Sequence, residues 1–173
     1  MKYLLFFILL SLICENVFAQ EKRAKKAEIP AKMMDFIKKN YPNHSKLKFY
    51  KEIKNDTLYF ESTFYSDKNE HTLSFDKIGN LEETEITLPF EKIPMEIKQK
   101  IKDYLKNNFL KFKVKKTQEV DLKGVLLYEF AIKAKRKTEK NTTEKSIYEI
   151  YFDRKGDFIK IETIKLNSIQ SLF

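Results

Sequence analysis

Cysteine, histidine, glycine and tryptophan are scarce in this 173-residue chain, which has one cysteine, two histidines, three glycines and no tryptophan. The cysteine, Cys14, lies in a leader that we expect to be removed, so the mature chain cannot form a disulfide. Only His44 and His71 could supply imidazole ligands, so a zinc site would need carboxylates at unremarkable spacing. For His71 we expect a partly buried core position rather than a metal ligand.

The usual sequence marks of catalysis are also absent. The chain has no Gly-x-Ser-x-Gly elbow, no cysteine nucleophile after processing and no glycine-rich phosphate loop. An acidic run, Glu82, Glu83 and Glu85, could supply the two carboxylates of a glycosidase. However, Glu83 and Glu85 share one face of a strand, where exposed carboxylates are common. We therefore predict no enzyme, no cofactor and no metal. A hydrolase built from carboxylates alone is the remaining catalytic alternative.

Residues 1–19 have the pattern of a cleavable secretory signal peptide. Lys2 provides a positive start, residues 4–13 are almost entirely apolar, and Val17-Phe18-Ala19 precedes the expected cut. We predict cleavage between Ala19 and Gln20 and a periplasmic or secreted mature protein.

Two other fates of this leader stay open. A membrane anchor needs about 20 apolar residues to cross the bilayer, whereas this run is interrupted by Glu15 and Asn16. Attachment of lipid to Cys14 needs a small residue before the cysteine, and Ile13 is not small.

The formal charge of +9 favours anionic binding partners. Removing residues 1–19 deletes Lys2 and Glu15, so the mature chain keeps this charge. A basic cytosolic protein would suggest nucleic acid, but export removes that opportunity, and the lysines are spread along the chain. We predict no nucleic-acid partner. Anionic glycans, lipid headgroups and acidic proteins are better matched to the charge.

Hydrophobic spacing predicts two helices. After residues 20–28, which we expect to be a disordered basic linker, four apolar residues follow the helical period: Met33, Phe36, Ile37 and Tyr41. The second set begins after Pro94 and consists of Ile97, Ile101, Tyr104 and Leu105. An Ile-Pro pair precedes each helix, and proline is favoured near a helix start.

After each predicted helix the apolar period changes to two, which is typical of half-buried strands. All three glycines occur in Asp-x-x-Gly sequences, at 76–79, 121–124 and 153–156. An aspartate can accept hydrogen bonds from the amides of a turn, and glycine takes the positive-φ position at low cost. These sequences predict hairpin turns. A calcium-loop interpretation would need more carboxylates in each loop.

The order of helix and about four strands occurs twice, which predicts an α+β fold made of a tandem repeat of helix plus antiparallel β-strands. The sequence Phe-Asp-x-x-Gly at 75–79 returns at 152–156, and an aromatic-Glu pair at 60–61 returns at 128–129. The predicted divisions are repeat 1 at 29–90, repeat 2 at 91–166 and a C-terminal tail at 167–173. A basic insertion is expected in the stretch 133–145.

This combination resembles the PepSY-like secreted proteins that are similar to β-lactamase inhibitor proteins. The motifs that carry the resemblance are structural, namely the two Ile-Pro helices, the aromatic-Glu strands and the Phe-Asp-x-x-Gly turns. The resemblance covers nearly the whole mature chain. It implies one curved sheet with helices on one face, in a secreted or periplasmic protein, and it adds no catalytic residues.

Strand alternation supplies the first functional hypothesis, a module that binds or inhibits an envelope protein or peptide through the open sheet face. Tyrosine contributes rigid area and a hydroxyl, so a mixture of tyrosine and carboxylate suits recognition. The alternative is an ordinary sheet surface. The candidate residues are Tyr59, Glu61, Tyr65, Glu129, Glu149 and Tyr151.

The second hypothesis is a structural envelope protein that associates with anionic lipid or glycan through basic segments. A lysine near an anionic membrane contributes about 1 kcal/mol, and the alternative for these residues is a solvated hairpin loop. Rising salt should abolish such surface association but spare an aromatic interface. We expect a monomer in either case. The candidate basic patch is Lys133, Lys135, Arg136, Lys137 and Lys140.

Overall fold

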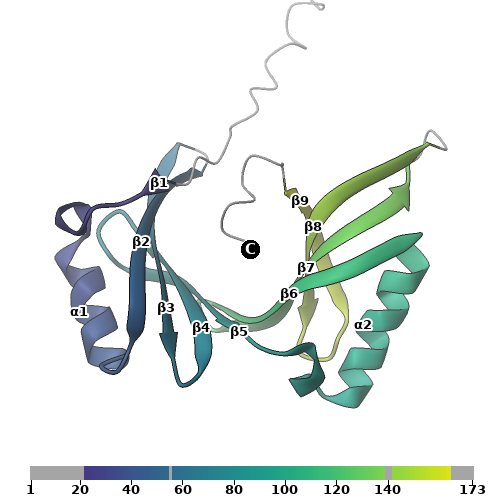
Figure 1. Cartoon of the computed structure of the whole chain (residues 1–173), viewed down its shortest axis with the longest axis horizontal. Helices are drawn as coiled ribbons and strands as arrows, with labels where there is room; N and C mark the ends of the chain where they lie inside the picture. Colours follow the sequence, from purple (N-terminus) through teal and green to yellow (C-terminus); the bar gives the residue numbers. More distant parts are fainter. Residues whose placement is uncertain (1–21, 55, 139–141, 165–173) are drawn as a thin grey trace, which may run out of the picture.

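A computed structural model describes residues 22–54, 56–138 and 142–164. In these residues nine strands form one antiparallel sheet, and each strand lies beside its neighbours in sequence (Figure 1). The strands are β1 (Lys22–Arg23), β2 (Ser45–Lys54), β3 (Thr57–Ser66), β4 (Asn69–Asp76), β5 (Leu81–Thr87), β6 (Lys111–Leu122), β7 (Val125–Lys137), β8 (Thr143–Asp153) and β9 (Phe158–Ile164). The helices are α1 (Ala31–Asn40) and α2 (Met95–Asn108), with short 3₁₀ turns at Lys26–Glu28 and Phe90–Lys92.

The predicted fold class, a tandem repeat of helix plus antiparallel strands, is wrong. Strand β5 pairs with β6 from Glu83 opposite Leu122 to Thr87 opposite Gln118. The ladder is therefore continuous from β1 to β9, and the molecule is one large sheet with two helices. Two separate units would each expose an unpaired edge at this point, whereas pairing β5 with β6 satisfies both edges.

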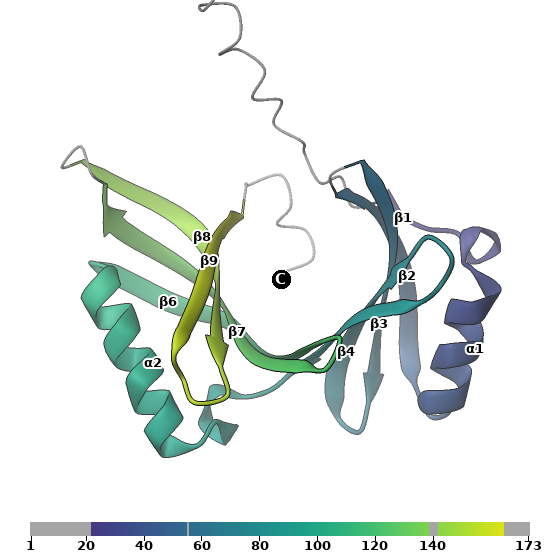
Figure 2. The same cartoon turned by 180° about the vertical axis from the view of Figure 1, so that it is seen from behind.

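The sheet is strongly curved, and both helices lie on its convex face (Figures 1 and 2). Helix α1 covers the N-terminal end of the sheet and α2 covers the C-terminal end. Among the described residues, neither helix is long and apolar enough to cross a membrane. The concave face carries neither helix, so its side chains are available to form a surface.

Two hydrophobic cores lie between the helices and the sheet. Each helix contributes the apolar stripe that its 3.6-residue period predicts, which buries Met33 and Ile37 of α1 and Ile101 and Leu105 of α2. Alternate residues of the strands complete each core. The N-terminal core also contains Phe49, Phe60, Phe64, Leu73 and Phe75, and the C-terminal core Tyr128, Phe130, Ile132, Tyr148, Ile150 and Phe152.

The predicted Asp-x-x-Gly hairpin between β4 and β5 is confirmed. Asp76 Oδ1 accepts hydrogen bonds from the backbone amides of Ile78 at 2.9 Å and Asn80 at 2.8 Å. Gly79 has a φ of +88°, and a Cβ there would lie 2.9 Å from the backbone nitrogen of Met33. Glycine is needed both for the positive φ and for close packing of this turn on α1.

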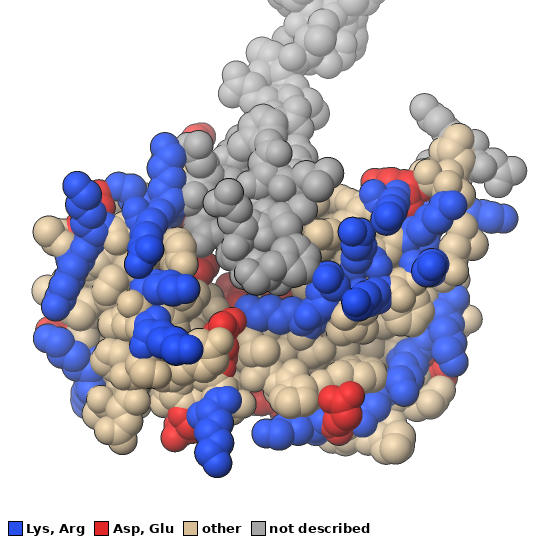
Figure 3. Space-filling view, viewed as in Figure 1, with Lys and Arg blue, Asp and Glu red and all other residues tan. Residues whose placement is uncertain are grey.

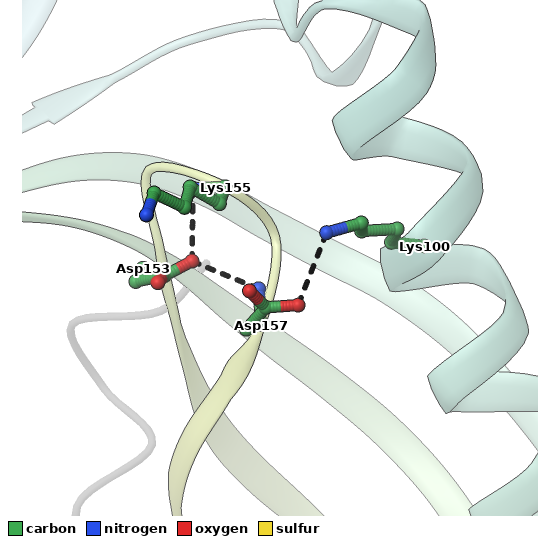
Figure 4. A network of polar contacts seen from close by, with 4 residues as sticks. All are labelled: Lys100, Asp153, Lys155 and Asp157. Carbon is green, nitrogen blue, oxygen red and sulfur yellow. Dashed lines mark hydrogen bonds and ion pairs between the residues drawn. The ribbon is translucent and has the colours of Figure 1, made fainter.

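The β8–β9 hairpin repeats this geometry against α2 (Figure 4). Asp153 Oδ1 accepts hydrogen bonds from the amides of Lys155 at 2.8 Å and Asp157 at 2.9 Å. Lys100 of α2 forms an ion pair with Asp157 at 3.1 Å. These hydrogen bonds hold the pKa of the Asp153 carboxyl below its usual range. The turn thus links the end of the sheet to the helix that covers it.

Two segments differ from expectation in the same way, because strand pairing extends further than hydrophobic periodicity suggests. Residues 22–28, expected to be a disordered basic linker, include β1, which pairs with β2, and Ala24 packs in the N-terminal core. The basic stretch 133–145, expected to be a loop, is largely strand, since Lys133 lies opposite Ile147 and Lys137 opposite Thr143. Ladder hydrogen bonds form regardless of side-chain polarity.

Candidate functional site

The concave face carries all six residues of the predicted sheet-face site. They alternate along their strands with residues that face the helices. Tyr59, Glu61 and Tyr65 come from β3, and Glu129, Glu149 and Tyr151 come from β7 and β8. The curved sheet brings the last three together but separates them from the first three by β4, β5 and β6. The predicted site is therefore two patches on one face.

The β7–β8 patch centres on a buried carboxyl, Glu129, which is only 3% exposed. Cross-strand register places Gln118 on one side of Glu129 and Tyr151 on the other. Gln118 Nε2 donates a hydrogen bond to Glu85 Oε2 at 2.6 Å, and Tyr151 hydrogen-bonds to the Glu129 carboxyl. We call Glu85, Gln118, Glu129, Glu149 and Tyr151 the Glu129 cluster. Glu85 and Gln118 were not among the residues predicted for this site from the sequence.

Burial raises the pKa of Glu129 well above its usual value, and the nearby Glu85 and Glu149 carboxylates raise it further. The hydrogen bond from Tyr151 acts in the opposite direction. Burial raises the pKa of Tyr151, and the Glu129 and Glu149 carboxyls raise it further, which keeps its hydroxyl as a donor. The cluster therefore retains protons that exposed carboxyls would lose.

A metal site is not formed by this cluster. Within residues 22–54, 56–138 and 142–164, no group of three or more His, Cys, Asp and Glu side chains is placed to hold a metal ion. His71, one of the two histidines, lies in the N-terminal core, stacked on the Phe64 ring at 5.4 Å. Its burial confirms the core position expected from its strand parity, and burial lowers its pKa.

The β3 patch is more exposed. Tyr65 is 42% exposed, and Lys46 Nζ lies 5.2 Å from the centre of its ring. A hydrogen bond with Glu70 raises the pKa of Tyr65. Glu70 also forms a 3.5 Å ion pair with Lys116 of β6. This patch offers the accessible aromatic surface that the Glu129 cluster does not.

The predicted basic patch is divided between two faces. Lys133, Lys135 and Lys137 alternate with the core residues of β7 and lie on the concave face. Arg136 lies on the opposite face, 4.8 Å from the centre of the Tyr148 ring and 3.6 Å from Glu144. Lys140 lies outside the described residues.

Neighbouring strands add three lysines to the concave part of this patch. Lys111 lies opposite Lys135, Lys113 lies opposite Lys133, and Lys145 lies opposite Lys135 on its other side. Figure 3 shows Lys and Arg side chains over both ends of the molecule, with a group over the C-terminal end. Lys111 and Lys113 were not predicted as part of this patch, although they alternate with the apolar Phe112 and Val114 in the sequence. We call Lys111, Lys113, Lys133, Lys135, Lys137 and Lys145 the lysine ladder.

Comparisons with known proteins find neither a matching protein-family model nor a matching curated protein. Solved structures with the same fold do exist. The chain is similar to a BLIP-like protein from Bacteroides fragilis NCTC 9343, with 17% identity, a TM-score of 0.57, and coverage of 79% of this chain and 87% of that chain. A DUF2874 family protein from Bacteroides ovatus ATCC 8483 gives 15% identity, a TM-score of 0.59, and coverage of 82% and 93%.

A third structure, from Bacteroides eggerthii DSM 20697, is described as periplasmic and gives 14% identity, a TM-score of 0.58, and coverage of 78% and 88%. These similarities establish the fold. They confirm the resemblance to β-lactamase-inhibitor-like proteins at that level.

Proposed function

We propose that the mature chain is an exported, non-catalytic binding module of the cell envelope that holds a protein or peptide on its concave sheet face. The observation that carries this proposal is the position of both helices on the convex face (Figures 1 and 2). Antiparallel sheets commonly pack one face on a core and present the other to solvent. Here the presented face is broad, curved and lined with tyrosine, carboxylate and lysine side chains.

Export is supported by the leader and by the similar fold of a protein described as periplasmic. The positive start, apolar run and Ala19 of residues 1–19 fit a cleavable signal peptide. Cleavage between Ala19 and Gln20 would leave all described residues in the mature protein.

The concave face has the composition of a recognition surface rather than an active site. Tyr65 offers accessible ring area together with a hydroxyl, and tyrosine is enriched in protein interfaces. Inward curvature lets a partner contact more area than a flat sheet would allow. Glu129 and Tyr151 are buried, so they support the floor of this surface rather than its contact layer.

Tagged residues 20–173 and concave-face variants would test the proposal in pull-downs from envelope extract at low and high salt. The variant with Tyr59→Ala and Tyr65→Ala removes accessible tyrosines, and Tyr151→Phe removes the buried hydroxyl while keeping the ring. Met95→Ala is the control, because Met95 is 75% exposed and begins α2 on the convex side. We expect the double tyrosine variant to lose a salt-resistant partner that the control retains. Equal recovery by all variants would contradict the proposal.

The second candidate function is association with an anionic glycan or lipid through basic side chains. The lysine ladder favours it, because these lysines gather on one face. Cosedimentation with phosphatidylglycerol vesicles tests this candidate. Binding that disappears at high salt and is unaffected by the tyrosine substitutions would favour it.

A further inference from the structure

We propose that the lysine ladder binds an extended acidic segment of the partner polypeptide, with carboxylates at alternate residues. This inference rests on the proposed function, because it places the partner on the same concave face. It goes further by naming the partner's chemistry and the part of the face that recognises it.

The lysine ladder carries positive charge that is not paired within the described residues. In the described part of the chain, the side chains of the ladder make no ion pair or hydrogen bond, whereas nearby charged groups are already used. Glu144 pairs with Arg136 on the other face at 3.6 Å. Lys116, further along β6, pairs with Glu70 at 3.5 Å. An anionic ligand is therefore the partner that would complete this part of the surface.

Repulsion between the lysines of the ladder also destabilises the folded sheet. Lys111 and Lys135 are direct cross-strand neighbours, and so are Lys135 and Lys145. Like charges placed directly opposite each other destabilise a sheet. The cores gain nothing from these side chains, because Ile132 and Ala134 face the core from the alternate positions of β7. A ligand that neutralises the lysines would remove this repulsion.

The spacing of the lysines along β7 matches the repeat of an extended peptide. Alternate residues of a strand lie about 6.8 Å apart on one face, and neighbouring strands lie about 4.8 Å apart. Lys133, Lys135 and Lys137 follow this spacing along β7, with Lys111 and Lys113 beside them on β6. An extended peptide has the same repeat along its own length. Carboxylates at its alternate residues would match successive lysines of β7, of which Lys133 and Lys135 have a lysine beside them on a neighbouring strand.

The position of the ladder further limits the partner. It occupies the inner side of the curved sheet, opposite the face that α2 covers. An extended chain can lie along β7 there and match the repeat of the strand, whereas lipid headgroups have no such repeat. An anionic glycan could also enter, but it does not share the two-residue repeat of a strand. These considerations favour polypeptide.

Two fluorescent peptides of equal composition provide the probe. One alternates glutamate and threonine over eight residues, and the other has four glutamates followed by four threonines. Binding to residues 20–173 is measured by fluorescence anisotropy at about 50 mM salt, where the Debye length exceeds 10 Å. We expect the alternating peptide to bind about threefold more tightly than the blocked one, because only its carboxylates match the ladder.

Matched variants assign the binding to the ladder. Lys133→Thr, Lys135→Thr and Lys145→Thr together should weaken binding of the alternating peptide by about tenfold or more. The control variant loses the same charge outside the face, through Lys38→Gln, Lys39→Gln and Lys106→Gln, and should bind like the parent. A third variant keeps the charge with Lys133→Arg, Lys135→Arg and Lys145→Arg, and should also retain binding. It keeps the test decisive if the threonine variant folds poorly.

Three results would overturn the inference: equal affinity for the two peptides, equal weakening in the control variant, or binding of vesicles or an anionic polysaccharide such as dextran sulfate without binding of either peptide. These results are separable from failure of the proposed function. If neither peptide binds but the tyrosine variant still loses a salt-resistant partner, the ladder inference fails and the binding module remains. If the alternating peptide binds and the tyrosine variant retains every partner, the ladder stands and the tyrosine patch does not.

Discussion

The two ends of the sheet share an arrangement of helix against strands, yet they differ in how far the strands extend. Helix α1 has 10 residues and α2 has 14, while β3 has 10 residues and β7 has 13. Buried polar groups without a hydrogen-bond partner among the described residues occur in both cores, namely Ser62 Oγ and His71 Nδ1 at the N-terminal end and the Tyr148 hydroxyl at the C-terminal end. Such groups are costly in either core, and the C-terminal core is the larger of the two, with eleven buried hydrophobic residues against nine.

The longer strands at the C-terminal end contribute exposed residues to the concave face as well as buried residues to the core. Lys133, Lys135 and Lys137 are exposed on the concave side of β7, while Ile132 and Ala134 remain buried against α2. At the N-terminal end, Tyr59 and Tyr65 occupy the concave side of the shorter β3. The C-terminal end thus presents a row of like charges on its concave side, whereas the N-terminal end presents aromatic groups there.

The largest expected effect comes from the cores. Phe130→Ala and Phe75→Ala should each destabilise the protein by about 3–5 kcal/mol, because both rings are fully buried. Phe130 should cost more, since its ring contacts both Phe90 and Phe152 at 5.6 Å, whereas Phe75 contacts Phe36 at 5.7 Å. Urea unfolding of residues 20–173 measures both. One shared transition is expected from the continuous sheet, and separate transitions would show that the two ends unfold independently.

The second-largest expected effect concerns glycine substitutions in two turns, one of which packs on a helix while the other does not. Gly79→Ala should cost about 2–3 kcal/mol, because it combines a positive φ with a steric clash against the α1 backbone. Gly124→Ala should cost only about 1 kcal/mol, since its φ of +89° is similar but its Cβ would meet open space. Thermal unfolding compares the two. Equal losses would mean that the close packing of the turn on α1 contributes nothing.

The Glu129 cluster should make stability depend on pH. The pKa of Glu129 is raised in the folded protein, so its favourable contribution is fully present below its unfolded pKa, near 4.5. That contribution is lost as pH rises through the folded pKa. Glu129→Gln removes the ionisable group, so folding no longer requires either a buried charge or the uptake of a proton, and it should stabilise the protein by about 1–3 kcal/mol at neutral pH. It should also flatten stability against pH. Chemical unfolding between about pH 5 and 8 measures this effect, and an unchanged profile would contradict it.

The smallest expected effect compares single lysines at the two ends. Lys135→Thr removes a charge that faces lysines on both sides, and it should stabilise the protein by about 0.2–1 kcal/mol at low salt. Lys48→Thr is the matched control, because Lys48 is also an exposed strand lysine but faces Thr63. The difference between the variants should shrink as salt rises. A difference that persists at high salt would point to β-propensity instead of charge.

Much of the local structure could be predicted from the sequence. The spacing of Met33, Ile37, Ile101 and Leu105 correctly indicated the buried faces of both helices. The Asp-x-x-Gly pattern correctly indicated hairpins, because the turn needs a residue of positive φ next to a carboxylate acceptor. These features depend on groups close together in the chain.

The candidate site was predicted less completely. Strand parity correctly assigned Tyr59 and Tyr151 to the concave face, but it did not indicate that their patches lie on well-separated strands. The basic-loop prediction grouped Arg136 with the lysines, although Lys135 and Lys137 beside it on β7 point to the opposite face. Treating 133–145 as a loop hid this alternation.

Local sequence thus determined the helices, the turns and the face on which each strand residue lies, because a fixed period of 3.6 or 2 residues relates each side chain to its near neighbours. Only the tertiary structure decided which distant residues became neighbours. Pairing of β5 with β6 joined the strands into one sheet, and cross-strand register set Lys135 between Lys111 and Lys145. The physical reason is that register depends on the joint packing of whole strands on their helices, and a shift of one residue would reverse every face.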